Sequence, residues 1–161
     1  MTDIITDLEA DHQKILAFIN EFEQRLIKFM EENIIDFKQM ADDILFIREF
    51  ADKHHHQREE KILFKYMIDH LGTVAKNLVQ QGMMIEHDLA RLYVKQLEET
   101  LQSYQQTHLL IDKLTIISTG HSYCILLTRH IEKEDTVVYP FARKNLSAEI
   151  FKLMNQENQN Y

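Results

Sequence analysis

The scarcity of residues that interrupt helices is the feature that most restricts the fold of this chain. Its 161 residues include three glycines and one proline, far fewer than average usage would give. A β-rich fold needs turn residues at short intervals, whereas long helices with few connections need hardly any. The sequence therefore predicts an all-α fold.

Apolar residues recur at helical spacing along four long segments. In the first, residues 3–32, Leu8, Ile15 and Ile19 follow one another at steps of seven and four residues, which is typical of an amphipathic helix. We expect three more long helices over residues 37–69, 75–104 and 109–138. Four long helices with short links predict an antiparallel up-down four-helix bundle. No internal boundary is evident, so residues 1–161 are expected to form a single domain.

The few helix-breaking residues indicate where these helices end. Gly72 is well placed to end the second helix. Pro140 is expected to close the fourth, because proline cannot continue a helix, and Gly120 weakens the helical pattern of that segment. Ser147 is a good N-cap, so a short C-terminal helix is expected to begin there.

Charge and cysteine content exclude several classes of partner. The net charge of −8 disfavours nucleic acids and anionic membranes. The single cysteine, Cys124, cannot form an internal disulfide and suits a reducing compartment. The acidic N-terminus is unlike a signal peptide, and no apolar run approaches the roughly eighteen residues of a membrane span. We expect a cytoplasmic protein, monomeric or homodimeric.

The unusual feature of the composition is its nine histidines. His56 and Glu60 are four residues apart, so they lie on one face of a helix, and His130 and Glu134 repeat this spacing. Two other histidines, His55 and His108, also precede an acidic residue by four positions, so a single pair means little.

The distribution of these residues over the four helices is more informative than any pair. With His12 on the first helix and His87 on the third, each helix offers one histidine, and two helices add a carboxylate. At about 1.5 Å per residue, these positions fall at similar heights in an up-down bundle. Four imidazoles and two carboxylates in a bundle core suit a dinuclear site of borderline metals.

Four segments of the chain resemble hemerythrin-like (HHE cation-binding) domains: LEADHQKI, HHHQREEKILF, MMIEHDLARLY and RHIEKEDTVVYPFA. The resemblance spans about residues 5–145. It implies a non-heme di-iron centre, with or without an oxo or hydroxo bridge, inside an up-down bundle. The paired glutamates before Leu63 and Phe64 match the family pattern and select His56 from the histidine triplet. The ligands implied are His12, His56, Glu60, His87, His130 and Glu134.

The chain also departs from the oxygen-carrying members of that family. These have a second histidine four residues after the third-helix ligand, where Arg91 stands here. Their last carboxylate is an aspartate five residues after histidine, whereas Glu134 is four residues after His130. The resemblance is therefore to bacterial hemerythrin-like proteins linked to peroxide, nitric oxide or iron handling.

Several neighbouring residues have more than one interpretation. His54 and His55 are expected to be solvated or, at most, outer partners of the site. Glu59 is expected to be a surface charge or an acceptor for an imidazole N–H rather than a further carboxylate ligand. Tyr123 either lines the site, where it would bind an oxygen species, or packs in the core. Arg91 either pairs with a carboxylate of the site, or gates it, or reaches solvent. His121 is expected to face away from the site.

Two functions follow from these expectations. The first is a di-iron protein that binds or reduces a small oxidant, namely dioxygen, hydrogen peroxide or nitric oxide. The alternative is an iron- or oxygen-sensing or metal-storage module without catalysis, and a bundle that holds no metal is a third interpretation. Manganese or zinc would suit similar ligands, and the sequence does not decide whether the protein is an enzyme.

Overall fold

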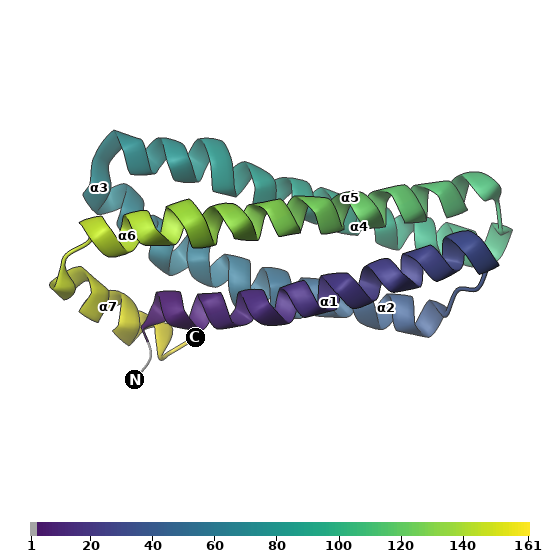
Figure 1. Ribbon diagram of the computed structural model, residues 1–161, viewed down its shortest axis with the longest axis horizontal. Coiled ribbons are helices and arrows are strands. Elements are labelled where there is room, and N and C mark those ends of the chain that lie inside the picture. The colour runs from purple at the N-terminus through teal and green to yellow at the C-terminus, as the bar shows by residue number, and fades with distance from the viewer. Residues whose placement is uncertain (1–2) are drawn as a thin grey trace.

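The computed structural model describes residues 3–161, and over this range the chain is a bundle of helices with no β-strand (Figure 1). The first helix, α1 (Ile4–Glu32), begins at Asp3, whose side chain accepts a hydrogen bond from the backbone N–H of Thr6. It ends at Asn33, which adopts the left-handed conformation. The predicted first helix and the break after it are both confirmed.

The second long segment begins at α2 (Phe37–Phe46) and continues to α3 (Phe64–Leu78) without a loop. Two π-helical stretches, Ile47–His56 and Glu59–Leu63, lie between these helices. Within α3, Gly72 has a φ of 68° and a ψ of −157°, so the chain changes direction there. A residue with a side chain adopts this conformation only with strain, and the break predicted at Gly72 is confirmed.

The remaining helices differ from the expectations at their ends. The third π-helical stretch, Val79–Met83, leads into α4 (Met84–Thr107), which extends three residues beyond the expected end at residue 104. After the link at residues 108–109 comes α5 (Leu110–Lys133).

The expectation that Pro140 closes the fourth helix is wrong. The chain continues from α5 through a fourth π-helical stretch, Glu134–Val138, into α6 (Tyr139–Asn145). Pro140 is the second residue of α6, which directly follows that π-helical stretch. The last helix, α7 (Ala148–Asn158), is capped by the side chain of Ser147 as predicted.

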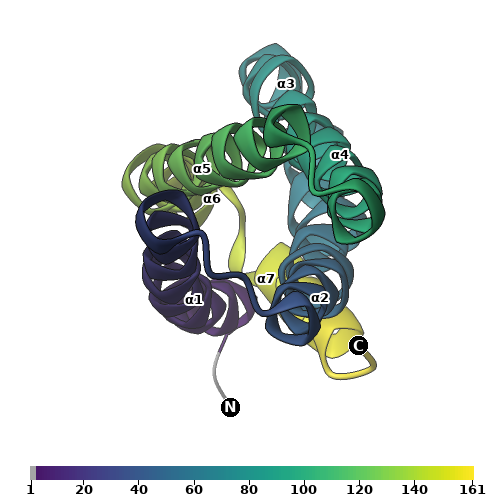
Figure 2. The same cartoon turned by 90° about the vertical axis from the view of Figure 1, so that its right-hand side faces the viewer.

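Viewed along its axis, the bundle has α1, α2, α4 and α5 around a common centre (Figure 2). The two chain ends lie at one end of the bundle together with α7 (Figure 1). No helix in residues 3–161 combines the length and the apolar character that crossing a membrane would require.

Buried apolar side chains form two clusters, one toward each end of the bundle. The larger uses residues 15–51 and 90–131, and the smaller uses residues 4–8, 62–83 and 138–154. The candidate ligands fall between these blocks of sequence, except His130, which comes one residue before the end of the larger cluster, so they form a polar layer between two apolar clusters. Within the larger cluster α1 packs closely on α5 at Gly120, where an added Cβ would lie 2.9 Å from Leu26 Cδ1.

Candidate metal centre

Histidine and glutamate side chains form two adjoining groups in the polar layer. In each group, one donor atom from every member lies within 4.8 Å of the others. All members are buried, with at most 2% of their surface exposed. The first group contains His56, Glu59, His87 and His130, and the second contains His12, His55, Glu59 and Glu134.

The two carboxylates connect the two groups. Glu134 Oε1 lies 3.1 Å from His130 Nε2, and its Oε2 lies 3.2 Å from His12 Nε2. Glu59 Oε2 lies 3.5 Å from His87 Nε2 and 3.6 Å from His55 Nε2. Each carboxylate therefore reaches imidazoles on both sides, which is the arrangement that two bridged cations need.

Several polar atoms in these groups are buried without a hydrogen-bond partner among the described residues. They are both ring nitrogens of His55 and His56, Glu59 Oε2, and both carboxylate oxygens of Glu134. Buried polar atoms without partners are rare, because their desolvation is not compensated. A bound cation would compensate it.

The nitrogen atoms are also spaced as metal ligands are. His87 Nε2 and His130 Nε2 face each other at 3.0 Å, close to the ~3 Å that separates neighbouring ligands at right angles on an ion with bonds of ~2.1 Å. Imidazole and carboxylate together are donors that borderline first-row metals accept. The residues present therefore fit a metal centre.

A carboxylate faces the outer nitrogen of each of the five imidazoles. Such a partner keeps the proton on Nδ1, so that Nε2 presents its lone pair to a cation. In three pairs the Nδ1–H donates directly to the carboxylate. These are His12 to Asp135 at 2.7 Å, His87 to Glu60 at 2.7 Å, and His130 to Glu86 at 2.8 Å.

The two adjacent histidines have the same arrangement at longer range. His55 Nδ1 lies 3.8 Å from Asp11, and His56 Nδ1 lies 3.6 Å from Asp52. Asp11 is itself buried and accepts a hydrogen bond from the guanidinium of Arg58. All five imidazoles therefore turn Nδ1 outward and Nε2 toward the centre of the bundle.

The pKa values in the layer reflect charges held close together in a buried site. Burial lowers the pKa of His12, but Asp135 and Glu134 together raise it to about 9. Burial likewise opposes protonation of His130, whose pKa Glu134 and Glu86 raise to about 10. Burial and the charge of Glu134 raise the pKa of Glu59. In the absence of metal, protons bound by His12, His130 and Glu59 offset the negative charge of the buried carboxylates.

The structure brings together most of the ligands that the sequence analysis named. His12, His56, His87, His130 and Glu134 all belong to the two groups. Glu60 does not join them. Its carboxylate is 19% exposed and lies outside the layer, against His87 Nδ1 and the Arg91 guanidinium.

Two residues of the site were not among the predicted ligands. His55 was predicted to be solvated, and Glu59 to be a surface charge or an outer acceptor in preference to a further ligand, but they are 1% and 0% exposed and both belong to the groups. The reason is the π-helical backbone of residues 47–56 and 59–63. Its wider turn rotates less per residue than an α-helix, so two consecutive histidines face the same side. His54 remains partly exposed, at 40%.

Tyr139 is a further residue that sequence reasoning missed. Its hydroxyl donates to Glu59 Oε1 at 2.5 Å and lies 3.3 Å from His12 Nε2, and its ring stacks on that imidazole. It lies five residues after Glu134, which is the period of the π-helical stretch between them. A search at α-helical spacing would not find it.

Contacts resolve the open interpretations of Arg91 and His121. Arg91 pairs with Asp52 and with Glu60, both at 2.7 Å, so it contacts the outer carboxylates. Tyr123 is 1% exposed. His121 faces outward as predicted and pairs with Glu23.

Comparison with known proteins agrees with this geometry. The family model of the hemerythrin HHE cation-binding domain matches residues 3–142, a range that includes every residue of the two groups. No curated protein matches the chain.

Proposed function

The chain belongs to the hemerythrin HHE cation-binding domain family, and on that premise we propose that it holds two iron ions and binds or reduces a small oxidant at them. The observation that carries the proposal is the pair of buried carboxylates, Glu59 and Glu134, each of which reaches imidazoles of both groups. The proposal includes an antiparallel up-down order of the helices, which would bring the ligand-bearing face of each helix to the polar layer.

The proposed ligand set follows from the two groups. His56, His87 and His130 would hold one ion, His12 and His55 the other, and Glu59 and Glu134 both. This set differs from the one expected by spacing, because His55 and Glu59 are added and Glu60 becomes an outer partner of His87. Bound iron would supply reversible electron transfer and a coordination position for the oxidant.

The residues around the ligands prepare them for this role. The outer carboxylates fix the tautomers of His12, His87 and His130 and so orient their lone pairs. Tyr139 donates to one oxygen of Glu59 and leaves the other, Oε2, facing the two groups. The apolar clusters on either side limit the access of water.

The test is the metal content of protein purified without an affinity tag or chelator and loaded with ferrous ion under anaerobic conditions. We expect two iron ions per chain, one for each group. Glu134→Ala should abolish the binding, because this carboxylate serves both groups, whereas His121→Ala, on the exposed face, should not change it. A loaded wild-type chain without stoichiometric metal would refute the proposal.

The oxidant is tested next on the same sample. Hydrogen peroxide that takes one electron from each of two ferrous ions leaves as two hydroxide ions, so two ferrous ions should disappear per peroxide. A sensing or storage module would bind the same amount of iron without turning over added peroxide.

A further inference from the structure

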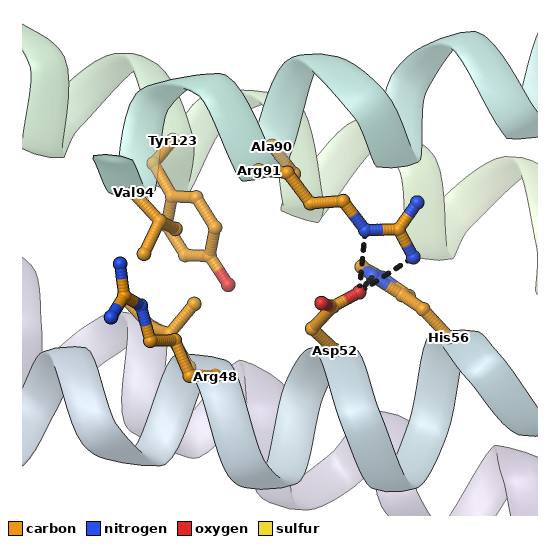
Figure 3. A pocket seen from close by; sticks show the side chains of 8 residues that line it. Arg48, Asp52, His56, Ala90, Arg91, Val94 and Tyr123 are labelled. Carbon is orange, nitrogen blue, oxygen red and sulfur yellow. Dashed lines mark hydrogen bonds and ion pairs between the residues drawn. The ribbon is translucent and has the colours of Figure 1, made fainter. Parts of the chain in front are cut away.

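A cavity of about 160 Å³ lies beside the first group of ligands. Its walls come from the π-helical stretch at residues 47–56, from α4 and from α5 (Figure 3). His56 forms part of its lining and is also a member of the first metal group. The cavity therefore adjoins the proposed metal centre at one of its ligands.

A buried hydroxyl group points into this cavity. Tyr123 is 1% exposed, and its hydroxyl has no hydrogen-bond partner within residues 3–161. Figure 3 shows this hydroxyl directed into the space between Arg48 and Asp52. Leaving a buried hydroxyl without a partner is costly, so the group is suited to a ligand that accepts a hydrogen bond. Burial also raises the pKa of Tyr123, so the hydroxyl remains a donor.

The charges around the cavity are compensated. Arg91 pairs with Asp52 and Glu60 at 2.7 Å each, and Arg48 pairs with Glu98 at 2.6 Å. Asp88 also pairs with Arg91, at 3.2 Å, so four carboxylates accompany the two guanidinium groups, and no positive charge is left to attract an anion. The cavity favours a neutral molecule over nitrite, azide or another small anion.

The volume limits the size of the ligand. Sites for metabolite-sized ligands are typically about 300–1,000 Å³. The ligand therefore consists of a few heavy atoms.

We propose that this cavity admits a small, neutral, hydrogen-bond-accepting oxidant of the peroxide class, which the Tyr123 hydroxyl holds beside His56 before it reaches the metal. The inference rests on the proposed metal centre and goes further, because it names the class of oxidant, the side of entry and the residue that selects it. Ala90 and Val94 form apolar parts of the same wall, so larger side chains there would fill the passage.

Three variants separate the passage from the hydrogen bond. Ala90→Phe and Val94→Phe fill the cavity, and Tyr123→Phe removes only the hydroxyl. Ser118→Phe is the matched control, because it adds the same ring in a different surface pocket, between α1 and α5. Metal content is measured first, so that a loss of the centre is recognised as such. Two second-order rate constants follow: oxidation of the ferrous protein by hydrogen peroxide, and association of nitric oxide, a weak hydrogen-bond acceptor.

The two ligands should respond differently. The filling variants should slow both reactions at least about tenfold while the metal content stays at the wild-type value. Tyr123→Phe should slow only the peroxide reaction, by about fivefold, the worth of one neutral hydrogen bond. Ser118→Phe should change neither reaction.

Three results would overturn the inference. The first is a filling variant that retains its metal and reacts with both ligands within twofold of wild type. The second is a Tyr123→Phe variant in which neither rate constant falls, or in which both fall equally. This result refutes the inference even if the filling variants fail to fold. The third is equal slowing by Ser118→Phe. Absence of metal from the wild-type chain would instead count against the proposed function itself.

Discussion

Adjacent histidines give the sharpest test of the ligand assignment. His54 is 40% exposed and contacts Asp11 at 3.3 Å, whereas His55 is 1% exposed and lies in the second metal group. Alanine substitution at the two positions removes the same side chain from the same turn of helix. We expect His55→Ala to lose metal-dependent stability and His54→Ala to retain it.

The size of the effect follows from linkage. Ferrous ion at one hundred times its dissociation constant stabilises the fold by about 2.7 kcal/mol, which for a chain of this length raises Tm by about 5–11 °C. Loss of an outer partner of a ligand typically weakens binding about 10–100-fold, so loss of His55 itself should cost at least a hundredfold. At the same iron concentration the stabilisation then falls to about 0.4 kcal/mol, or a shift of about 1–2 °C.

The assay is thermal unfolding followed by circular dichroism, with and without ferrous ion under anaerobic conditions. The metal-free melting curves serve as the control for folding. In the metal-free protein, His55→Ala removes a ring whose nitrogens are both unpartnered within residues 3–161, so its Tm should change little. Equal iron-dependent shifts in the two variants would refute the assignment of His55.

Two further perturbations test the charge and packing of the bundle. The pKa values of His12 (about 9) and His130 (about 10) lie above the ordinary value, so the metal-free stability that these two groups contribute should be full below pH ~6.5 and be lost as the pH rises through 9 and 10. Because metal must displace these protons, metal affinity should instead rise with pH. Thermal melts of the metal-free protein and metal titrations across this pH range check both trends. A metal-free Tm and a metal affinity that change in the same direction with pH would contradict the prediction. Gly120→Val should lower the free energy of unfolding by about 1–3 kcal/mol through overpacking against Leu26 and Phe22. An unchanged urea midpoint would contradict this and would show that these side chains of α1 move aside without cost.

Much of the fold follows from the sequence because long helices leave a regular pattern. The bounds of α1 and the break at Gly72 could be predicted, since Asn33 and Gly72 have the backbone conformations that such breaks require. The continuation through Pro140 could not, because it depends on the π-helical stretch at residues 134–138.

The candidate site divides in the same way. His12, His87 and His130 could be placed in one layer because each is a single histidine at a suitable height on its own helix. The triplet at residues 54–56 offered two registers, His55 with Glu59 and His56 with Glu60, and α-helical geometry permits only one. The π-helical backbone accommodates parts of both, with His55, His56 and Glu59 inward and Glu60 outward.

The polar layer between the two apolar clusters also has a mechanical consequence. In the metal-free protein it is a seam across the bundle, where charged groups replace the apolar contacts that join the rest of the core. The two ends of the bundle can then open as separate cooperative units, with amide hydrogens exchanging at different rates. Metal ions bound by side chains of α1, α4, α5 and the π-helical stretches would link the two ends across this layer. The amide hydrogens of both ends would then exchange in one cooperative opening.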